Sequence, residues 1–217
     1  MMIVDSQVHI WAADSPERPW PPIVAPTQSR PHKPEPITTD DMLREMKVAG
    51  VDRAVIAPPV WEGVRNDLAL AAAKKYPDKF AVMGRVDLNN PASKDLLPTW
   101  KQQPGMLGLR YALGRPLVRP LLIEGRIDWL WPAAEAAGLP LMLFPLACDL
   151  HLFDRIAERH PNLKITIDHL ALGRGKDDVA FKEFDLLLPL AKRPNISVKV
   201  NCLPLYTTRS EEHTSEL

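Results

Sequence analysis

The chain has 217 residues, of which 46% are hydrophobic and 25% charged, so it can bury one substantial core. Basic and acidic residues both total 27, and this zero net charge argues against nucleic acid or an anionic membrane as the partner. A small molecule is the partner we expect. No apolar run approaches the length that crosses a bilayer, and the opening residues resemble no secretion signal, which together predict a cytoplasmic protein.

Short apolar or β-branched segments alternate with helical ones, as in parallel βα architectures. The expected strands are 2–9, 53–57, 80–86, 108–111, 139–144, 163–169 and 196–200, and the expected helices are 39–49, 66–75, 94–102, 126–137, 150–160 and 179–192. Seven such repeats predict an α/β fold, a (β/α)8 TIM barrel truncated after strand seven, in residues 1–208. Open edges on strands one and seven would favour a homo-oligomer.

The first expected strand, in VDSQVHIW, has polar residues at alternate positions. Side chains alternate along a strand, so Asp5, Gln7 and His9 are expected to share one face and point into the barrel. His9 would then lie nearest the substrate at the carboxyl end of the strand. On its own, a single histidine is more often a hydrogen-bonded core residue than a catalyst.

A proline-rich segment, 15–36, follows this strand. In a barrel the loop after strand one lies on the catalytic face, where proline stiffens it, and Trp11 and Trp20 could offer flat apolar surface to the substrate. Two other interpretations stay open. Pro16 and Pro19 have the spacing of a polyproline ligand, and the segment could also be a solvated surface loop.

Three polar residues mark the ends of strands two to four. Asn66 could donate an amide hydrogen bond to substrate or simply cap a helix. Arg85 ends strand three and could bind substrate or pair with Asp87. Arg110 ends the short strand in GMLGLRY, where a guanidinium can hold a substrate carboxylate or stabilise an oxyanion.

A second strand-end histidine appears in LKITIDHLALG, where His169 closes strand six. Imidazole titrates near neutrality, so it can accept a proton from water or bind a metal. Asp168 has the opposite parity and is expected to point toward the helices. On strand seven, Lys199 shares the polar side with Ser197 and Asn201, either as a second cation at the site or as a lysine paired to a carboxylate.

The last residues, 209–217 (RSEEHTSEL), have no apolar periodicity and resemble the translation of a sequencing adapter. We interpret them as non-native read-through, with a natural polar tail as the alternative, and leave His213 out of the site.

Four segments resemble the amidohydrolase-related TIM-barrel proteins, in particular the lactonase branch with L-fuconolactonase-like and 2-pyrone-4,6-dicarboxylate lactonase-like enzymes. They are VDSQVHIW, residues 66–87, GLR at 108–110 and HPNLKITIDHLALG at 160–173. The resemblance implies hydrolysis of a cyclic ester of a sugar acid or an aromatic breakdown product. It also implies a general-base aspartate on strand eight, and without it the chain as written should be nearly inactive.

The sequence departs from the family's metal site. Gln7 replaces the first histidine of the strand-one pair and strand five offers none, so only His9 and His169 remain as metal ligands. A catalytic zinc takes about three protein ligands, so we expect no cofactor, with a single zinc or manganese ion as the alternative.

These observations predict a lactonase. His9, His169 and Arg110 are its candidate catalytic residues, and its candidate substrate-binding residues are Gln7, Trp11, Asn66, Arg85 and Lys199. The substrate would be a lactone or a carboxylate. Two alternatives remain: a metal-dependent decarboxylase of the same superfamily, and a non-catalytic interaction protein.

Overall fold

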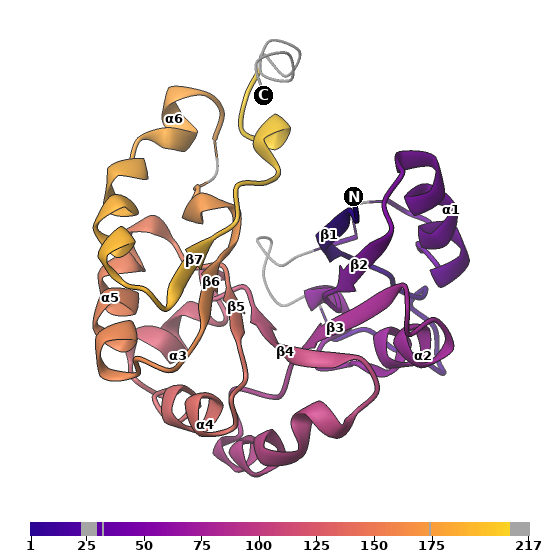
Figure 1. Cartoon of the computed structure of the whole chain (residues 1–217), viewed down its shortest axis with the longest axis horizontal. Coiled ribbons are helices and arrows are strands. Elements are labelled where there is room, and N and C mark those ends of the chain that lie inside the picture. The colour runs from indigo at the N-terminus through magenta and orange to yellow at the C-terminus, as the bar shows by residue number, and fades with distance from the viewer. Residues whose placement is uncertain (23–29, 32, 174, 209–217) are drawn as a thin grey trace. The chain divides into compact units, whose positions relative to one another are not determined.

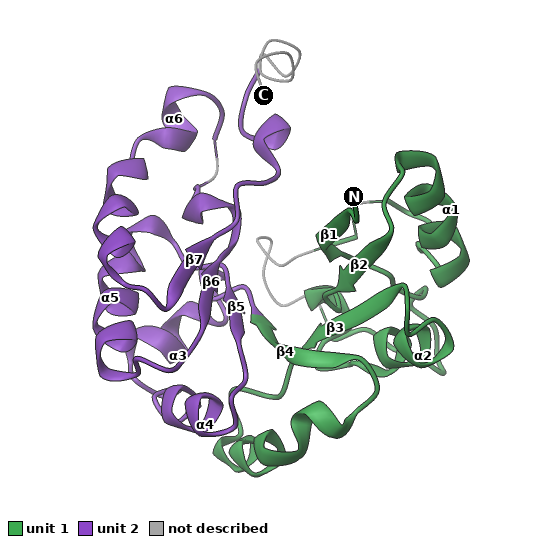
Figure 2. Cartoon of the chain, in the orientation of Figure 1, with its two compact units in different colours: residues 1–110 green, residues 111–217 purple. Residues whose placement is uncertain are grey.

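The computed structural model describes residues 1–22, 30–31, 33–173 and 175–208. The chain divides into two compact units, Met1–Arg110 and Tyr111–Leu217, which are drawn in green and purple in Figure 2. The predicted tail, 209–217, lies outside the described residues. Within the described residues, no helix combines the length and apolar character needed to cross a membrane.

Unit 1 contains parallel strands joined by helical connections (Figure 1). Its strands are β1 (Val4–Val8), β2 (Arg53–Ile56), β3 (Phe80–Gly84) and β4 (Met106–Tyr111), which pair in chain order. The connections contain α1 (Thr39–Ala49), α2 (Asp67–Lys75) and the 3₁₀ helices η1 (Val60–Glu62) and η2 (Pro91–Gln102). Each predicted strand and helix of this unit is present, although η2 is 3₁₀ rather than α.

Local sequence determines both ends of the helix α1. Thr38 caps it with a capping box, in which the Thr38 hydroxyl accepts from the Asp41 N–H and the Asp41 carboxylate accepts from the Thr38 N–H. Gly50 ends it in the left-handed conformation, with φ of 69°. The predicted bounds of this helix are confirmed.

The first strand departs from simple alternation. Its pairing with β2 shifts register between Asp5 and Val8, so that three steps along β1 match two steps along β2. One extra residue turns the following side chains to the other face of a strand. The prediction that Asp5, Gln7 and His9 share one face by uninterrupted alternation is therefore wrong.

Unit 2 continues the parallel βα pattern. Its strands β5 (Leu141–Leu143), β6 (Ile165–Ile167) and β7 (Ile196–Val198) pair in chain order. The α helices are α3 (Arg119–Ile123), α4 (Leu130–Ala136), α5 (Leu150–Arg159) and α6 (Asp178–Phe181), and 3₁₀ turns η3 (Ala147–Asp149), η4 (Asp168–Ala171), η5 (Phe184–Leu186), η6 (Leu188–Lys192) and η7 (Leu203–Leu205) complete the unit. The sequence did not predict α3.

The predicted helix 179–192 is broken into α6, η5 and η6. Pro189 explains the break at η6, because proline lacks an N–H and its ring clashes with the carbonyl four residues earlier. By contrast, α5 forms as predicted. It buries Leu150, Phe153 and Ile156 along one stripe, and Phe153 is fully buried.

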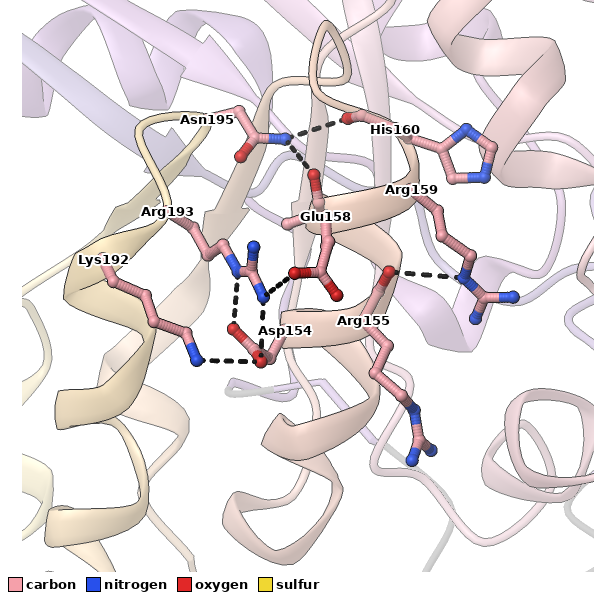
Figure 3. Close-up of polar contacts among 9 residues, drawn as sticks. Asp154, Arg155, Glu158, Arg159, His160, Lys192, Arg193 and Asn195 are labelled. Atoms are coloured by element: carbon pink, nitrogen blue, oxygen red, sulfur yellow. Dashed lines mark hydrogen bonds and ion pairs between the residues drawn. The ribbon is translucent and has the colours of Figure 1, made fainter.

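Polar contacts fasten α5 to the segment that leads into β7 (Figure 3). Asp154 binds the guanidinium of Arg193 at 2.7 Å and the ammonium of Lys192 at 3.2 Å. The buried amide of Asn195 donates to the carbonyls of Ala157, His160 and Leu163, which lie at and beyond the last turn of α5. Carbonyls at the end of a helix lack partners within it, so Asn195 satisfies groups that burial would otherwise leave unpaired.

Candidate active site

His9 directly follows β1, and its ring is held by the end of the neighbouring strand. Its Nδ1 donates a hydrogen bond of 2.6 Å to the carbonyl of Ala57, which follows β2. Because a carbonyl oxygen only accepts, this contact puts the proton on Nδ1 and makes Nε2 the basic nitrogen. Trp61 and the imidazole pack edge-to-face, with 6.0 Å between ring centroids.

Trp11 is a buried residue, only 2% exposed, and packs edge-to-face against Trp61 at 5.4 Å. This burial does not fit the expectation that Trp11 offers flat open surface to a substrate. The indole instead supports the aromatic contact beside His9.

The start of the proline-rich segment is fixed by charge. Arg18 pairs with the buried Glu62 at 3.1 Å and makes two hydrogen bonds to Asp67, and these bonds lower the pKa of Asp67. Glu62 also accepts the N–H of Ala12. Arg18 and Glu62 thus tie the chain after β1 to the chain after β2. Residues 23–29 and 32 of the segment lie outside the described residues.

Asn66 does not make the helix-capping bond that was one of its two predicted roles. It occupies the N-cap position of α2 without making a side-chain capping bond. Its amide instead clamps the main chain of Arg85, accepting from the N–H and donating to the carbonyl, both at 2.9 Å. The neighbouring Gly84 permits this approach, because a Cβ there would lie 2.8 Å from the Asn66 oxygen.

The two arginines proposed for the site are both buried, each 6% exposed. The guanidinium of Arg85 donates to the carbonyl of Pro58, and the carboxylate of Asp87 accepts the N–H of Asn89. Arg110 lies near the carboxyl end of β4, as predicted. Gln7 is half-buried in β1. Side chains at the carboxyl ends of parallel strands form the active sites of TIM barrels.

In unit 2 the chain leaves β6 through a strained turn. His169, Leu170 and Ala171 all have positive φ, between 54° and 56°. The left-handed conformation costs a non-glycine residue on the order of 1–3 kcal/mol, so three in succession require support from their neighbours. Strain of this kind is often found at functional sites. The strand ends at Ile167, two residues before the predicted end.

Phe144 and Asn201 hold the ring of His169. Its Nδ1 lies 2.9 Å from the side-chain oxygen of Asn201, which follows β7. Phe144, which follows β5, packs edge-to-face on the ring with centroids 4.9 Å apart. The imidazole is thus fixed both in position and in the angle of its plane.

In the chain next to His169, Lys199 and Asp168 form an ion pair of 3.1 Å, with side chains 9% and 0% exposed. The Lys199 ammonium also lies 3.5 Å from the sulfur of Met142 on β5. Asp168 therefore lies on the same face as Lys199, and the prediction that it points toward the helices is wrong. The error arose because the turn begins after Ile167, so strand alternation does not extend to Asp168. Of the two predicted roles of Lys199, the structure shows the carboxylate-paired one.

The described residues contain no group of three or more histidine, cysteine, aspartate or glutamate side chains that could hold a metal ion. A catalytic zinc takes about three protein ligands and a water. The two histidines predicted as metal ligands are divided between the units, with His9 in unit 1 and His169 in unit 2.

Comparison with known proteins identifies the family. The amidohydrolase family model matches residues 4–215. The chain belongs to the amidohydrolase family. It is 27% identical to an L-fucono-1,5-lactonase from Burkholderia ambifaria over 215 residues, covering 92% of this chain and 67% of that protein.

Solved amidohydrolase structures share the fold. One is a probable 2-pyrone-4,6-dicarboxylic acid hydrolase from Acinetobacter baumannii with citric acid bound, at a TM-score of 0.75 and 19% identity, covering 97% of this chain and 74% of that one. Another is an amidohydrolase from Burkholderia multivorans with bound zinc, at a TM-score of 0.70 and 17% identity, covering 92% and 69%. The predicted TIM-barrel class is confirmed, with seven parallel strands among the described residues.

Several residues around the candidate site were missed from sequence or given another role. Trp61, Arg18 and Glu62 carry no local pattern that points to the site, because their partners lie more than 40 residues away. Asn201 was noted only for sharing a face with Lys199. One signal for it was available, namely its position just past strand seven, at the carboxyl end where barrel sites form.

Proposed function

We propose that the protein is a hydrolase that opens a lactone, a cyclic ester of a sugar acid or of an aromatic breakdown product. Water attacks the ring carbonyl, the ester C–O bond breaks, and the product is a hydroxy acid. The observation that supports this best is a pair of strand-end histidines, each with Nδ1 held by an oxygen, on a chain similar to an L-fucono-1,5-lactonase. The zero net charge fits a small-molecule substrate in the cytoplasm better than nucleic acid or a membrane.

In this proposal His169 activates the water, while His9 and Gln7 line the carbonyl. Arg110 binds a substrate carboxylate or the developing oxyanion through charge-assisted hydrogen bonds. His9 and Arg110 belong to unit 1 and His169 to unit 2, so their convergence at one substrate stays part of the proposal. An aspartate on an eighth strand, as the family resemblance implies, would complete proton transfer.

In this proposal the other candidates have supporting roles. Asn66 shapes the main chain that carries Arg85, and Trp11 packs beside His9 through Trp61. Lys199 is paired with Asp168, which reduces the positive charge that it offers to a substrate anion. We propose catalysis without a bound metal, because Gln7 replaces the first histidine of the family's strand-one pair and strand five offers none.

A lactone screen tests the proposal. The complete gene product is purified, because this chain spans only 67% of the lactonase that it matches. Sugar-acid and aromatic-derived lactones, with and without a carboxylate, are followed by proton release before and after treatment with a chelator. We expect ring opening that survives the chelator, with the carboxylated lactones preferred.

Three results would contradict the proposal in different ways. Ring opening that stops with the chelator and returns with zinc would refute the metal-free mechanism alone. Release of carbon dioxide from carboxylated aromatic acids, with the lactones intact, would point to a metal-dependent decarboxylase. No turnover of either class would favour a non-catalytic interaction protein.

A further inference from the structure

The end of β7 holds the turn that carries His169. The Lys199 N–H donates to the carbonyl of Ile167 at 2.8 Å, and the Lys199 carbonyl accepts the N–H of Leu170 at 3.2 Å. These two bonds hold the main chain on either side of Asp168 and His169. Two residues further on, Asn201 reaches the imidazole itself. Main chain and side chain of the same segment therefore set the position of His169.

The backbone at this turn requires such support. Three successive residues from His169 to Ala171 adopt the left-handed conformation, which residues with a Cβ rarely occupy. A conformation of this kind persists where the surrounding structure fixes it. Because the turn is held from β7, the imidazole has a defined position before any substrate arrives.

The atom that meets the ring decides where its proton lies. An amide oxygen accepts and never donates, so Nδ1 of His169 must carry the proton when it faces the Asn201 oxygen. Phe144 fixes the plane of the ring, which keeps Nδ1 directed at that oxygen. We infer that Asn201 is a positioning residue that holds neutral His169 in the Nδ1-protonated tautomer, with Nε2 as the basic nitrogen.

The tautomer of His169 matters for catalysis if the proposed lactonase function holds. A histidine that activates water needs an unprotonated nitrogen directed at that water, and a partner on the other nitrogen selects which one it is. Asn201 does for His169 what the Ala57 carbonyl does for His9. The tautomer itself can be measured without any substrate.

Nitrogen NMR of the imidazole rings tests the inference directly. The full chain is labelled with ¹⁵N and recorded near pH 8, and the His169 signals are assigned by their loss in His169→Gln. In the wild-type chain, Nδ1 of His169 should appear as the protonated nitrogen and Nε2 as the unprotonated one. A protonated Nε2 in the wild-type chain would overturn the inference, since the Asn201 amide would then be donating.

Two variants and a matched control distinguish a positioning role of Asn201 from a nonspecific disturbance of the fold. Asn201→Asp keeps an accepting oxygen and should keep the tautomer, whereas Asn201→Leu should shift the ring toward the Nε2-protonated form. Ser197→Ala removes a side-chain contact with Thr166 between β7 and β6, the strands that precede Asn201 and His169. It should leave the tautomer of His169 unchanged. An Asn201→Leu chain that folds and retains the wild-type tautomer would refute the role of Asn201. If Asn201→Leu does not fold, the inference is still tested by the protonated nitrogen of His169 in the wild-type chain and in Asn201→Asp.

Kinetics then connects the tautomer to the reaction. In the complete gene product, Asn201→Leu should lower kcat for the lactone about 10–100-fold with little change in KM, while Asn201→Asp recovers most of it. Unchanged kcat in Asn201→Leu, with the tautomer shifted, would refute the catalytic consequence. If the tautomer behaves as expected and no variant turns over lactone, the proposed function fails and the tautomer assignment stands.

Discussion

The two histidines of the candidate site are held by different kinds of acceptor. In unit 1, His9 donates to the main-chain carbonyl of Ala57, and in unit 2, His169 meets the side-chain oxygen of Asn201. Every residue supplies a carbonyl, whereas an amide side chain is lost with one substitution. Single substitutions should therefore disturb His169 more easily than His9.

The supports beneath the two rings differ as well. His9 sits directly after a paired strand, beside a buried tryptophan pair. His169 sits on a left-handed turn, next to an ion pair that is almost completely buried. A buried ion pair and a strained turn thus lie beside His169, whereas a paired strand and aromatic packing lie beside His9.

The largest effect on stability should follow from breaking the buried ion pair. Lys199→Met leaves the carboxylate of Asp168 buried without its cation, and removing one partner of a buried pair costs about 3–5 kcal/mol. Urea unfolding monitored by tryptophan fluorescence measures this loss. Lys79→Met is the matched control, since Lys79 is half-buried and its ammonium donates to the Asp52 carbonyl at 3.4 Å rather than to a buried carboxylate. This substitution should change stability by no more than about 0.5 kcal/mol.

Equal effects in Lys199→Met and Lys79→Met would show that the buried ion pair beside His169 does not stabilise unit 2. A second substitution sharpens this test. Asp168→Asn on top of Lys199→Met discharges the stranded carboxylate and should recover part of the lost stability.

A smaller effect is expected in unit 1 from the clamp on Arg85. Asn66→Ala leaves the N–H and carbonyl of Arg85 without their side-chain partner, which costs about 1–3 kcal/mol for a buried polar group. Asn89→Ala, at an exposed amide, serves as the control. If thermal unfolding of the two variants gives the same Tm, the clamp does not stabilise unit 1.

The smallest effect should appear only in acid. Hydrogen bonding to Arg193 lowers the pKa of Asp154 from 3.8 to about 2, so this pair stabilises the fold above pH 3.8. That contribution is lost as the pH falls from 3.8 toward 2, where the carboxylate of the folded state takes up its proton. In Asp154→Asn, the Tm difference from wild type should therefore shrink across this range. A difference that stays constant from pH 5 to pH 2 would contradict the assigned pKa.

Much of the fold could be predicted from sequence because it depends on local patterns. Apolar segments marked all seven strands, and polar and glycine residues at its ends allowed α1 to be predicted to the residue. Local signals also explain the main errors. Pro189 should have ended the helix predicted over 179–192, and the register shift in β1 arises from pairing with β2, which the strand alone does not reveal.

The candidate site was predictable in part. The strand-end positions of His9 and Arg110 follow from the βα pattern, since functional side chains gather where barrel strands end. The left-handed turn at His169 was not predictable, because it contains no glycine or asparagine that would signal positive φ. Asn201 and Asn66 act through partners 32 and 19 residues away, and one sequence does not show such pairs.

His9 and His169 together carry out lactone hydrolysis in the proposed function. The most direct test is kcat/KM for lactone opening by the complete gene product with both residues changed to glutamine, against His151→Gln at an exposed histidine of α5. The double variant should lose about 10²–10⁴-fold, with folding unchanged by circular dichroism, while His151→Gln stays at the wild-type rate. A double variant that opens the lactone as fast as the wild-type protein would contradict the claim.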